Sequence, residues 1–331
     1  MSIIFGFFPV VLFLGCLFLL DSFKLVKIHI LLLCLVWGIA SAGLSYLANT
    51  YTAEHINIGF ETFSRYVAPF TEELLKVILI VFLVTRKQIG FMIDAAIYGF
   101  AIGAGFALAE NLYYVVYLGH GFDAALAIVR GFGTAIMHGG TISVCSMILI
   151  EGVQRISKII PALAPGFLIA IILHSAFNQF MLNPLLQTLL IITMLPAVFY
   201  VVFARSTRNL QQWLEVEFST EVDMLRMIRV GRFSETKSGN YLASLKHHFS
   251  PEMVVDMYCF ISLYLDLSIK AKRNLMLRET GFDAIYEADM QEKLNELKQL
   301  RKNIGKTGEM ALLPLVRMNY REFWKLNQLR K

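Results

Sequence analysis

The sequence has few cysteines and little net charge, and these shortages exclude several classes of protein. Its four cysteines are scattered without a CxxC pair, so neither a disulfide framework nor a zinc ribbon is indicated. The net charge of +5 is too small to indicate nucleic-acid binding, because juxtamembrane lysines and arginines account for it equally well. HExxH and cysteine–histidine motifs are also missing, which removes two familiar routes to hydrolysis.

Long apolar runs are what the sequence has in excess. The chain is 56% hydrophobic, whereas a soluble domain has about 45–50% apolar residues. The apolar runs end near Arg205, and the rest of the chain has an ordinary charged composition. We therefore predict an all-α protein with two domains: a polytopic membrane helical bundle over residues 1–206 and an appended helical cytoplasmic domain over 207–331. We expect it to interact with the lipid bilayer, and we expect no nucleic-acid partner.

Seven apolar segments come close to the roughly 20 residues that a helix needs to cross a bilayer. They are residues 3–20, 28–48, 67–85, 91–118, 124–150, 159–181 and 184–204. Lysine and arginine are concentrated after the first, third, fifth and seventh segments. Because cytoplasmic loops are the basic ones, we predict a multi-pass protein of the cell membrane, with its N-terminus outside and its C-terminal domain in the cytoplasm.

Ionisable side chains lie within four consecutive segments, where they are energetically costly and functional candidates by default. The ionisable residues are Glu72, Glu73 and Lys76, then Glu110, then Arg130 and His138, and finally His174, and the carboxamides of Asn111 and Asn178 accompany Glu110 and His174. At about 1.5 Å per residue, Glu72, Glu110 and His174 lie at a similar depth in the outer half of the bilayer. We therefore expect these four helices to pack around one polar centre.

These residue types favour hydrolysis. A partly buried glutamate can act as a general base for water, and Lys76, four residues after Glu72, lies on the same helix face and can hold the carboxylate. His174 and Asn178 also share a face and have the donors to stabilise an oxyanion. This interpretation requires no cofactor. The alternative, a divalent metal such as zinc, would use carboxylates and imidazoles, here Glu72, Glu110, His138 and His174, and side-chain types do not decide between the two.

Three motifs in this region resemble those of a known family. "EELLK" (72–76) resembles the EExxK motif of PrsW-type intramembrane proteases, and "FALAE" (Phe106 to Glu110) resembles their FxxxE motif. "HSAFN" (174–178) is similar to the histidine motif of the wider superfamily, which includes type II CAAX prenyl endopeptidases and bacteriocin-processing enzymes. The resemblance covers about residues 60–181, and the motifs occur in order on consecutive predicted spans.

The resemblance implies an intramembrane endopeptidase of a bacterial membrane. Such enzymes make the site-1 cut in a membrane-anchored substrate, typically an anti-sigma factor, as part of a signalling pathway. The family pattern makes Glu72 the favoured base with Glu73 next, and puts His174 and Asn178 on the oxyanion side. Lys76, Phe106 and Arg130 would support the site.

Non-catalytic interpretations stay open for the same residues. Glu72 and Glu73 could be structural carboxylates neutralised by Lys76 and Arg130, and Glu110 could simply pair with Arg130. A proton-coupled transporter also uses buried ionisable residues, and a catalytically silent scaffold or sensor would explain the extra domain. PrsW-type proteases mostly consist of the membrane domain alone, so the extra domain is a departure from their pattern. It leaves open a cytoplasmic protein partner and a substrate other than an anti-sigma factor.

The appended domain has a mainly helical pattern. Ser250 as N-cap, Pro251 at the first position and Gly281 just past the end predict one long helix, and a second is predicted over residues 283–305.

Overall fold

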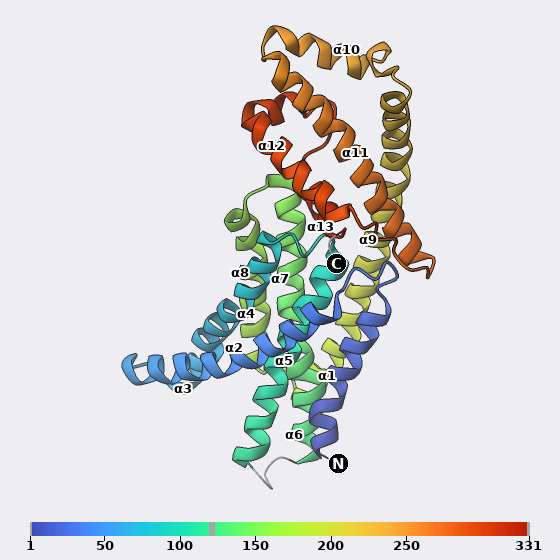
Figure 1. Cartoon of the computed structure of the whole chain (residues 1–331). Helices are drawn as coiled ribbons and strands as arrows, with labels where there is room; N and C mark the ends of the chain where they lie inside the picture. The colour runs from blue at the N-terminus through green and yellow to red at the C-terminus, as the bar shows by residue number, and fades with distance from the viewer. Residues whose placement is uncertain (1, 119–122, 330–331) are drawn as a thin grey trace. The chain divides into compact units, whose positions relative to one another are not determined.

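A computed structural model of the chain describes residues 2–118 and 123–329 (Figure 1). Within these residues every regular element is a helix and none is a strand, so the predicted all-α class is confirmed. The chain divides into two compact units, Met1–Ser206 and Thr207–Lys331. We call them unit 1 and unit 2 and describe each separately.

Unit 1 contains all the long apolar helices. Its elements are α1 (Ser2–Leu19), α2 (Ile28–His55), α3 (Phe60–Thr62), η1 (Phe63–Val67), α4 (Ala68–Thr85), α5 (Met92–Leu118), α6 (Ala124–Ile128), η3 (Val129–Thr134), α7 (Ala135–Ile156), α8 (Ile159–Asn178) and the beginning of α9 (Pro184–Arg229). Among the described residues, five helical segments are long and apolar enough to cross a membrane. The other two predicted spans correspond to α1, which is short, and to α4, which has three charged residues. The count of seven spans therefore stays a prediction.

Close backbone approaches hold α5 between α2 and α7. A Cβ on Gly38 of α2 would lie 2.1 Å from the carbonyl oxygen of Ile102 in α5. A Cβ on Gly103 of α5 would lie 2.2 Å from the carbonyl oxygen of His138 in α7. Small residues are what allow helices to pack this closely in membranes. Gly103 thus brings the backbone of His138 directly against α5.

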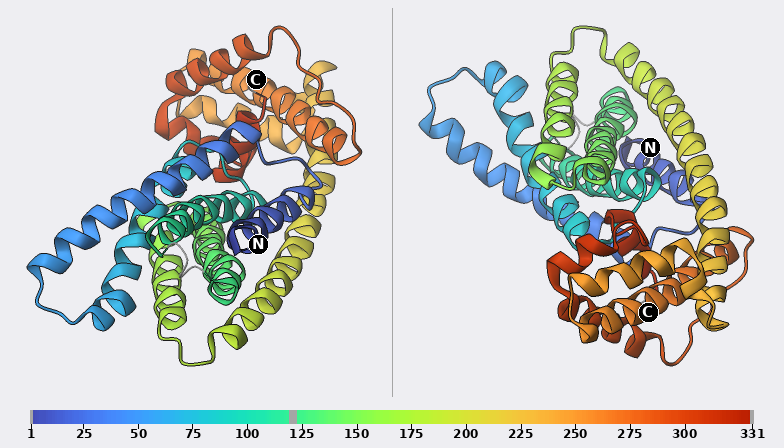
Figure 2. Two further views of the ribbon diagram at one scale, coloured as in Figure 1. Left: turned by 90° about the horizontal axis from the view of Figure 1, so that it is seen from below. Right: turned by 90° about the horizontal axis from the view of Figure 1, so that it is seen from above.

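Two π-helical segments precede helices that carry the predicted site residues. η1 leads into α4, and η3 leads into α7, so the predicted span 124–150 is the combination of α6, η3 and α7. Wide turns of this kind are frequent at functional sites in α-helices. Figure 2 shows that the C-terminal part of α2 and the short α3 extend beyond the other helices of unit 1.

Unit 2 is a small helical bundle with its own apolar core. It contains the remainder of α9, then η4 (Phe233–Glu235), α10 (Lys237–Ser244), η5 (Leu245–His247), α11 (Pro251–Glu279), α12 (Met290–Leu312) and α13 (Tyr320–Asn327). α11 is central, since Met257, Ile261 and Tyr264 along it are buried in the core. The helix begins as predicted, because the Ser250 hydroxyl accepts the backbone N–H of Met253 at 3.3 Å.

The second predicted helix of unit 2 starts later than predicted. It begins at Met290 rather than at residue 283, and its helical backbone is interrupted at Gly305 as predicted, where φ is 61°, before a further helical stretch to Leu312. The residues before Met290 are not helical because the side chain of Asn274 in α11 binds the backbone of Ile285. The carboxamide donates to the Ile285 carbonyl at 2.9 Å and accepts the Ile285 N–H at 3.1 Å. A tertiary contact therefore overrides local helix propensity here.

Candidate active site in unit 1

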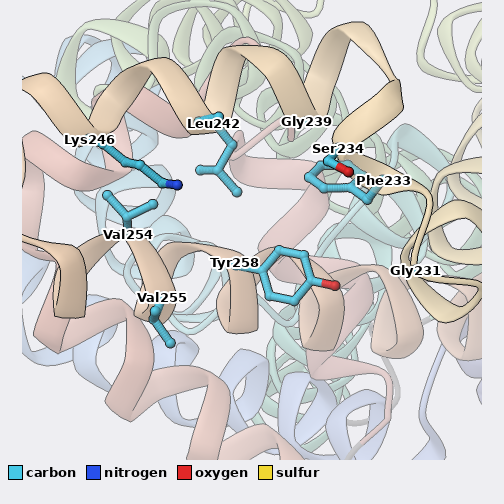
Figure 3. A pocket seen from close by; sticks show the side chains of 10 residues that line it. Gly231, Phe233, Ser234, Gly239, Leu242, Lys246, Val254, Val255 and Tyr258 are labelled. Carbon is cyan, nitrogen blue, oxygen red and sulfur yellow. The ribbon is translucent and has the colours of Figure 1, made fainter.

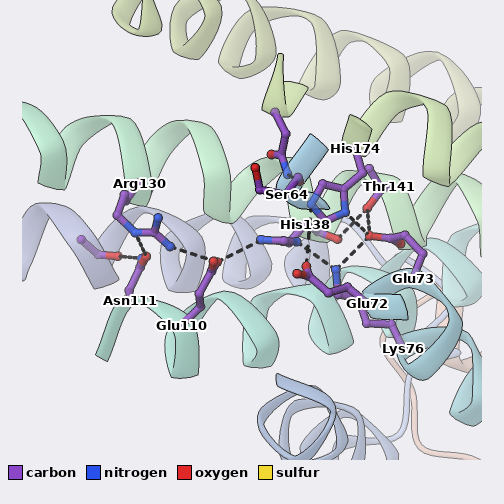
Figure 4. A network of polar contacts seen from close by, with 12 residues as sticks. Ser64, Glu72, Glu73, Lys76, Glu110, Asn111, Arg130, His138, Thr141 and His174 are labelled. Carbon is purple, nitrogen blue, oxygen red and sulfur yellow. Dashed lines mark hydrogen bonds and ion pairs between the residues drawn. The ribbon is translucent and has the colours of Figure 1, made fainter. Parts of the chain in front are cut away.

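Polar side chains from α4, α5, α7 and α8 meet in one cluster inside unit 1 (Figure 4). α4 contributes Glu72, Glu73 and Lys76, α5 contributes Glu110, α7 contributes His138 and Thr141, and α8 contributes His174. The structure thus brings together charged residues that are separated by up to a hundred positions in the sequence.

Glu73 is the anchor of this cluster. Its side chain is fully buried, and its Oε1 atom accepts hydrogen bonds from Lys76 Nζ at 2.8 Å, His174 Nδ1 at 2.9 Å and Thr141 Oγ1 at 3.2 Å. One carboxylate oxygen therefore joins α4, α7 and α8. The ion pair of Lys76 is made with Glu73 at i,i+3, whereas the i,i+4 spacing pointed to Glu72. Both spacings bring side chains together on a helix, and the direct ion pair in the structure is the one with the buried Glu73.

A chain of contacts leads from Lys76 to Glu110. Lys76 Nζ lies 2.9 Å from His138 Nδ1, and an ammonium group only donates. Nδ1 must therefore accept, so the hydrogen of the neutral ring is on Nε2, which donates to Glu110 Oε2 at 3.1 Å. Phe106 packs on both groups: its ring centroid is 4.0 Å from Lys76 Nζ and 4.8 Å from the His138 ring. The aromatic face thus adds a cation–π contact to the buried lysine.

Arg130 closes the other side of Glu110. Its guanidinium forms an ion pair with Glu110 Oε2 at 2.9 Å and donates from Nε to Asn111 Oδ1 at 3.0 Å. Asn111 in turn donates to the carbonyl of Gly6 in α1 at 2.7 Å, and the guanidinium lies 3.7 Å from the Tyr114 ring centroid. The predicted pairing of Glu110 with Arg130 is therefore present, and it ties α5, η3 and α1 together.

Thr141 was not selected from the sequence, whereas Asn111 was noted beside Glu110 without a role. Thr141 is uncharged, and uncharged polar residues are common enough in membrane helices to give no signal alone. Its position was the available signal, because Thr141 is three residues after His138 on the same helix face. Asn178, which was selected, donates to the backbone carbonyl of Ser64 in η1 at 3.1 Å and so joins α8 to η1.

Glu72 differs from Glu73 in facing open space. Its side chain is 15% exposed, compared with 0% for Glu73. It lines a cavity of about 940 Å³ between α2, α4 and α5, together with Glu110. Its Oε2 atom is 3.7 Å from His174 Nε2, which is too long for a direct hydrogen bond. One water molecule in front of both atoms could reach each of them.

The cluster also fits a metal ion by its donor atoms. Glu72, His138 and His174 each have a ligand atom within 4.8 Å of the others. Two imidazoles and a carboxylate are a donor set of catalytic zinc sites. Glu73 already holds His174 through Nδ1, which is the carboxylate–histidine arrangement that orients metal-binding imidazoles. His138 has partners on both ring nitrogens, so it would exchange one of them on binding.

Unit 2 has a groove of a different character. It has a volume of about 300 Å³ and lies between α10 and α11 (Figure 3). Phe233, Leu242, Val254 and Tyr258 give it a mainly apolar lining, and Lys246 is its charged residue. This composition suits apolar side chains and offers no set of groups for hydrolysis.

Buried ion pairs in unit 2 have a structural explanation. Lys272 of α11 contacts Glu217 at 3.3 Å and Glu221 at 3.1 Å, and Lys325 of α13 contacts Glu221 at 3.2 Å and also pairs with Glu322. Burial lowers the pKa of Lys272, and the neighbouring Lys325 charge lowers it further, while the carboxylates oppose both effects. These contacts fasten α9, α11 and α13 together.

Comparison with known proteins identifies a family. The model of the PrsW family of intramembrane metalloproteases matches residues 27–204, which is more than half of the chain. No curated protein and no solved structure matches significantly. The matched range includes all four helices that supply the polar cluster, and it confirms the resemblance seen in the EExxK, FxxxE and histidine motifs. The chain belongs to the PrsW family of intramembrane metalloproteases.

Proposed function

We propose that the protein is an endopeptidase that hydrolyses a peptide bond of a membrane-anchored protein, with Glu72 as the general base. One observation carries this proposal: Glu72 lines the large cavity, while Glu73 is buried behind it and is occupied by three donors. The neighbouring glutamates therefore have separate roles. Glu72 faces the substrate, and Glu73 positions Lys76 and His174.

In the proposed reaction Glu72 takes a proton from a water molecule that it shares with His174. Because Glu73 accepts the Nδ1 hydrogen of His174, the Nε2 atom of the neutral ring has a free electron pair and orients the same water. The water oxygen then bonds to the scissile carbonyl carbon to give a tetrahedral intermediate. As the proton on Glu72 is transferred to the amide nitrogen, the C–N bond breaks and leaves a carboxyl group and a free amine. Asn178 uses one N–H on Ser64 and has a second for the oxyanion.

A zinc-dependent form of the same hydrolysis is the second candidate, and the donor geometry supports it. Zinc would be held by Glu72, His138 and His174, and when bound it would act as a Lewis acid that lowers the pKa of a water molecule. Glu73 would hold the His174 ring in place, and Glu110 would do the same for His138.

Metal content separates the two versions. For the zinc version we expect about one zinc per chain in the purified full-length protein and a clear loss in His174→Ala and Glu72→Gln. Elemental analysis by mass spectrometry measures this without any activity assay. Glu151→Gln is a matched control, because it removes a carboxylate from a surface ion pair with Arg155. Equal zinc content in all variants would favour Glu72 acting without a metal.

The family resemblance supports a narrower target as well. We propose an anti-sigma-factor-like substrate, cut in the outer half of a bacterial cell membrane, with the C-terminal domain in the cytoplasm. The alternation of basic loops supports this orientation. Unit 2, with its apolar groove, would then be the place where a cytoplasmic protein regulates cleavage.

A substrate trap tests the function directly. Cells would express the wild type, Glu72→Gln or the control Glu151→Gln, and their membrane proteins would be compared by quantitative mass spectrometry. We expect one or a few membrane-anchored proteins to accumulate uncut only with Glu72→Gln. An identical fragment pattern in all three strains would contradict the proposal. Altered proton flux in liposomes with the same variant would instead point to a transporter.

A further inference from the structure

α1 contacts the polar cluster at two points, although it lies outside the family match. The family model matches residues 27–204, and α1 precedes them. At the first point Asn111 of α5 donates to the Gly6 carbonyl of α1 at 2.7 Å. At the second point η3 approaches so closely that a Cβ on Gly131 would lie 1.9 Å from the Phe5 carbonyl oxygen. The proposed reaction uses none of these four residues, so the contacts call for an explanation.

The sequence of α1 suits it to hold other helices through its backbone. Pro9 lies inside the helix and has no N–H, so the Phe5 carbonyl four residues earlier lacks its usual α-helical partner. Val10, Leu14 and Leu17 share one helix face and are buried, which fixes α1 against its neighbours. α1 therefore offers backbone acceptors from a fixed position.

Asn111 carries the contact from α1 to Arg130. Its side chain is 1% exposed, and Nδ2 donates to Gly6 while Oδ1 accepts the Arg130 Nε hydrogen at 3.0 Å. Chemistry fixes this orientation, because a carbonyl oxygen only accepts and a guanidinium only donates. Arg130 Nη2 pairs with Glu110, and the Tyr114 ring covers the guanidinium face at 3.7 Å. The guanidinium is thus held on two edges and one face.

The position of this guanidinium sets the charge that faces the substrate. Glu110 lines the same cavity as Glu72, and Arg130 neutralises it there. Glu72 forms no ion pair with a lysine or arginine in the described part of the chain. If Arg130 moved away, two uncompensated carboxylates would face the substrate and disfavour the negative charge that develops on the scissile carbonyl. Glu110 would also lose a partner that keeps it against His138.

We propose that Asn111 is a positioning residue for the peptidase reaction, and that α1 completes the active site by holding Asn111. The proposal rests on the proposed function and adds to it a residue and a helix that take no part in bond making. Asn111 acts through Arg130, and Arg130 acts through Glu110. The effect therefore appears in the chemical step rather than in substrate binding.

A double-mutant cycle tests whether Asn111 acts through Arg130. Asn111→Leu keeps a similar size and removes both the donor and the acceptor, and Asn295→Leu at an exposed position of unit 2 is the matched control. The probe is fluorescein-labelled casein, an unfolded polypeptide, added to the full-length protein in detergent. We expect Asn111→Leu to lower kcat roughly tenfold, the effect of one lost hydrogen bond to a charged group, and to change KM less than about twofold. In the Arg130→Met background it should lower kcat less than about twofold, because its target is gone.

Gly131→Ala disturbs the same position without removing a polar group. Its methyl group would meet the Phe5 carbonyl, so α1 and η3 would have to separate there. We expect the same selective loss of kcat, again roughly tenfold. Gly15→Ala on α1 is the matched control, since its Cβ meets nothing within 4 Å, and it should keep wild-type kinetics.

Thermal unfolding gives a readout that is independent of catalysis. Asn111→Leu should lower the melting temperature more in the wild type than in Arg130→Met, because the contact is already lost in the latter. A loss of kcat of equal size in both backgrounds, or a loss of kcat/KM that comes from KM, would overturn this proposal. Cleavage by Glu72→Gln at the wild-type rate would instead overturn the proposed function, and the unfolding cycle would still decide whether Asn111 holds Arg130.

Discussion

Replacing Glu72 by Gln is expected to slow peptide-bond cleavage by about 10²–10⁴-fold, the usual contribution of a general base. The carboxamide has a similar shape but cannot take a proton from water. Glu72 is partly exposed, and its contact with His174 is long at 3.7 Å, so the melting temperature should change little. The measurement is the rate of cleavage of a labelled polypeptide by the full-length protein, with Glu151→Gln as the control.

Glu73→Gln tests whether Glu72 is the base and Glu73 the residue that positions Lys76 and His174. It weakens an acceptor that holds Lys76, His174 and Thr141, so both stability and activity should fall. A stable but inactive Glu73→Gln beside an active Glu72→Gln would reverse the assignment of the two glutamates.

Lys76→Met is expected to destabilise the protein by about 3–5 kcal/mol, the usual effect of removing one partner of a buried ion pair. Lys76 and Glu73 are both fully buried, with Nζ and Oε1 2.8 Å apart. Without the ammonium group the Glu73 charge is left uncompensated, and His138 loses the donor to its Nδ1 atom. Thermal unfolding of the full-length protein in detergent, followed by exposure of its buried cysteines, measures the effect.

The double variant Lys76→Met with Glu73→Gln distinguishes charge from packing. Removing both charges should recover a large part of the lost stability, because the uncompensated carboxylate is gone. Lys298→Met, at an exposed position, is a control for the substitution itself. If the double variant is no more stable than Lys76→Met alone, the destabilisation comes from lost packing, and the electrostatic account is wrong.

The convergence of the polar side chains could be predicted from the sequence because each predicted helix crosses the same bilayer thickness. Depth along each span follows from residue number, and this alone places Glu72, Glu110 and His174 at one level. The helical class followed from the same apolar runs, since isolated spans in lipid must satisfy their own backbone. The family motifs then selected the same residues independently.

What the sequence could not provide depends on side-chain direction and on tertiary contacts. Spacing alone allowed Lys76 to pair with Glu72, and only packing shows that Glu73 points inward to meet it. The late start of α12 depends on Asn274, which lies outside the segment in α11 and forms hydrogen bonds with both backbone groups of Ile285.

The π-helical segment η3 has a consequence for how this site can change over generations. A single wide turn is equivalent to one residue inserted into an α-helix, and each residue turns a helix by about 100°. η3 contains Arg130 and leads directly into α7, which carries His138. Deleting one residue from this turn would restore ordinary winding and swing Arg130 away from Glu110 while His138 stayed in place. The position of Arg130 therefore depends on the length of this segment as well as on the residue itself.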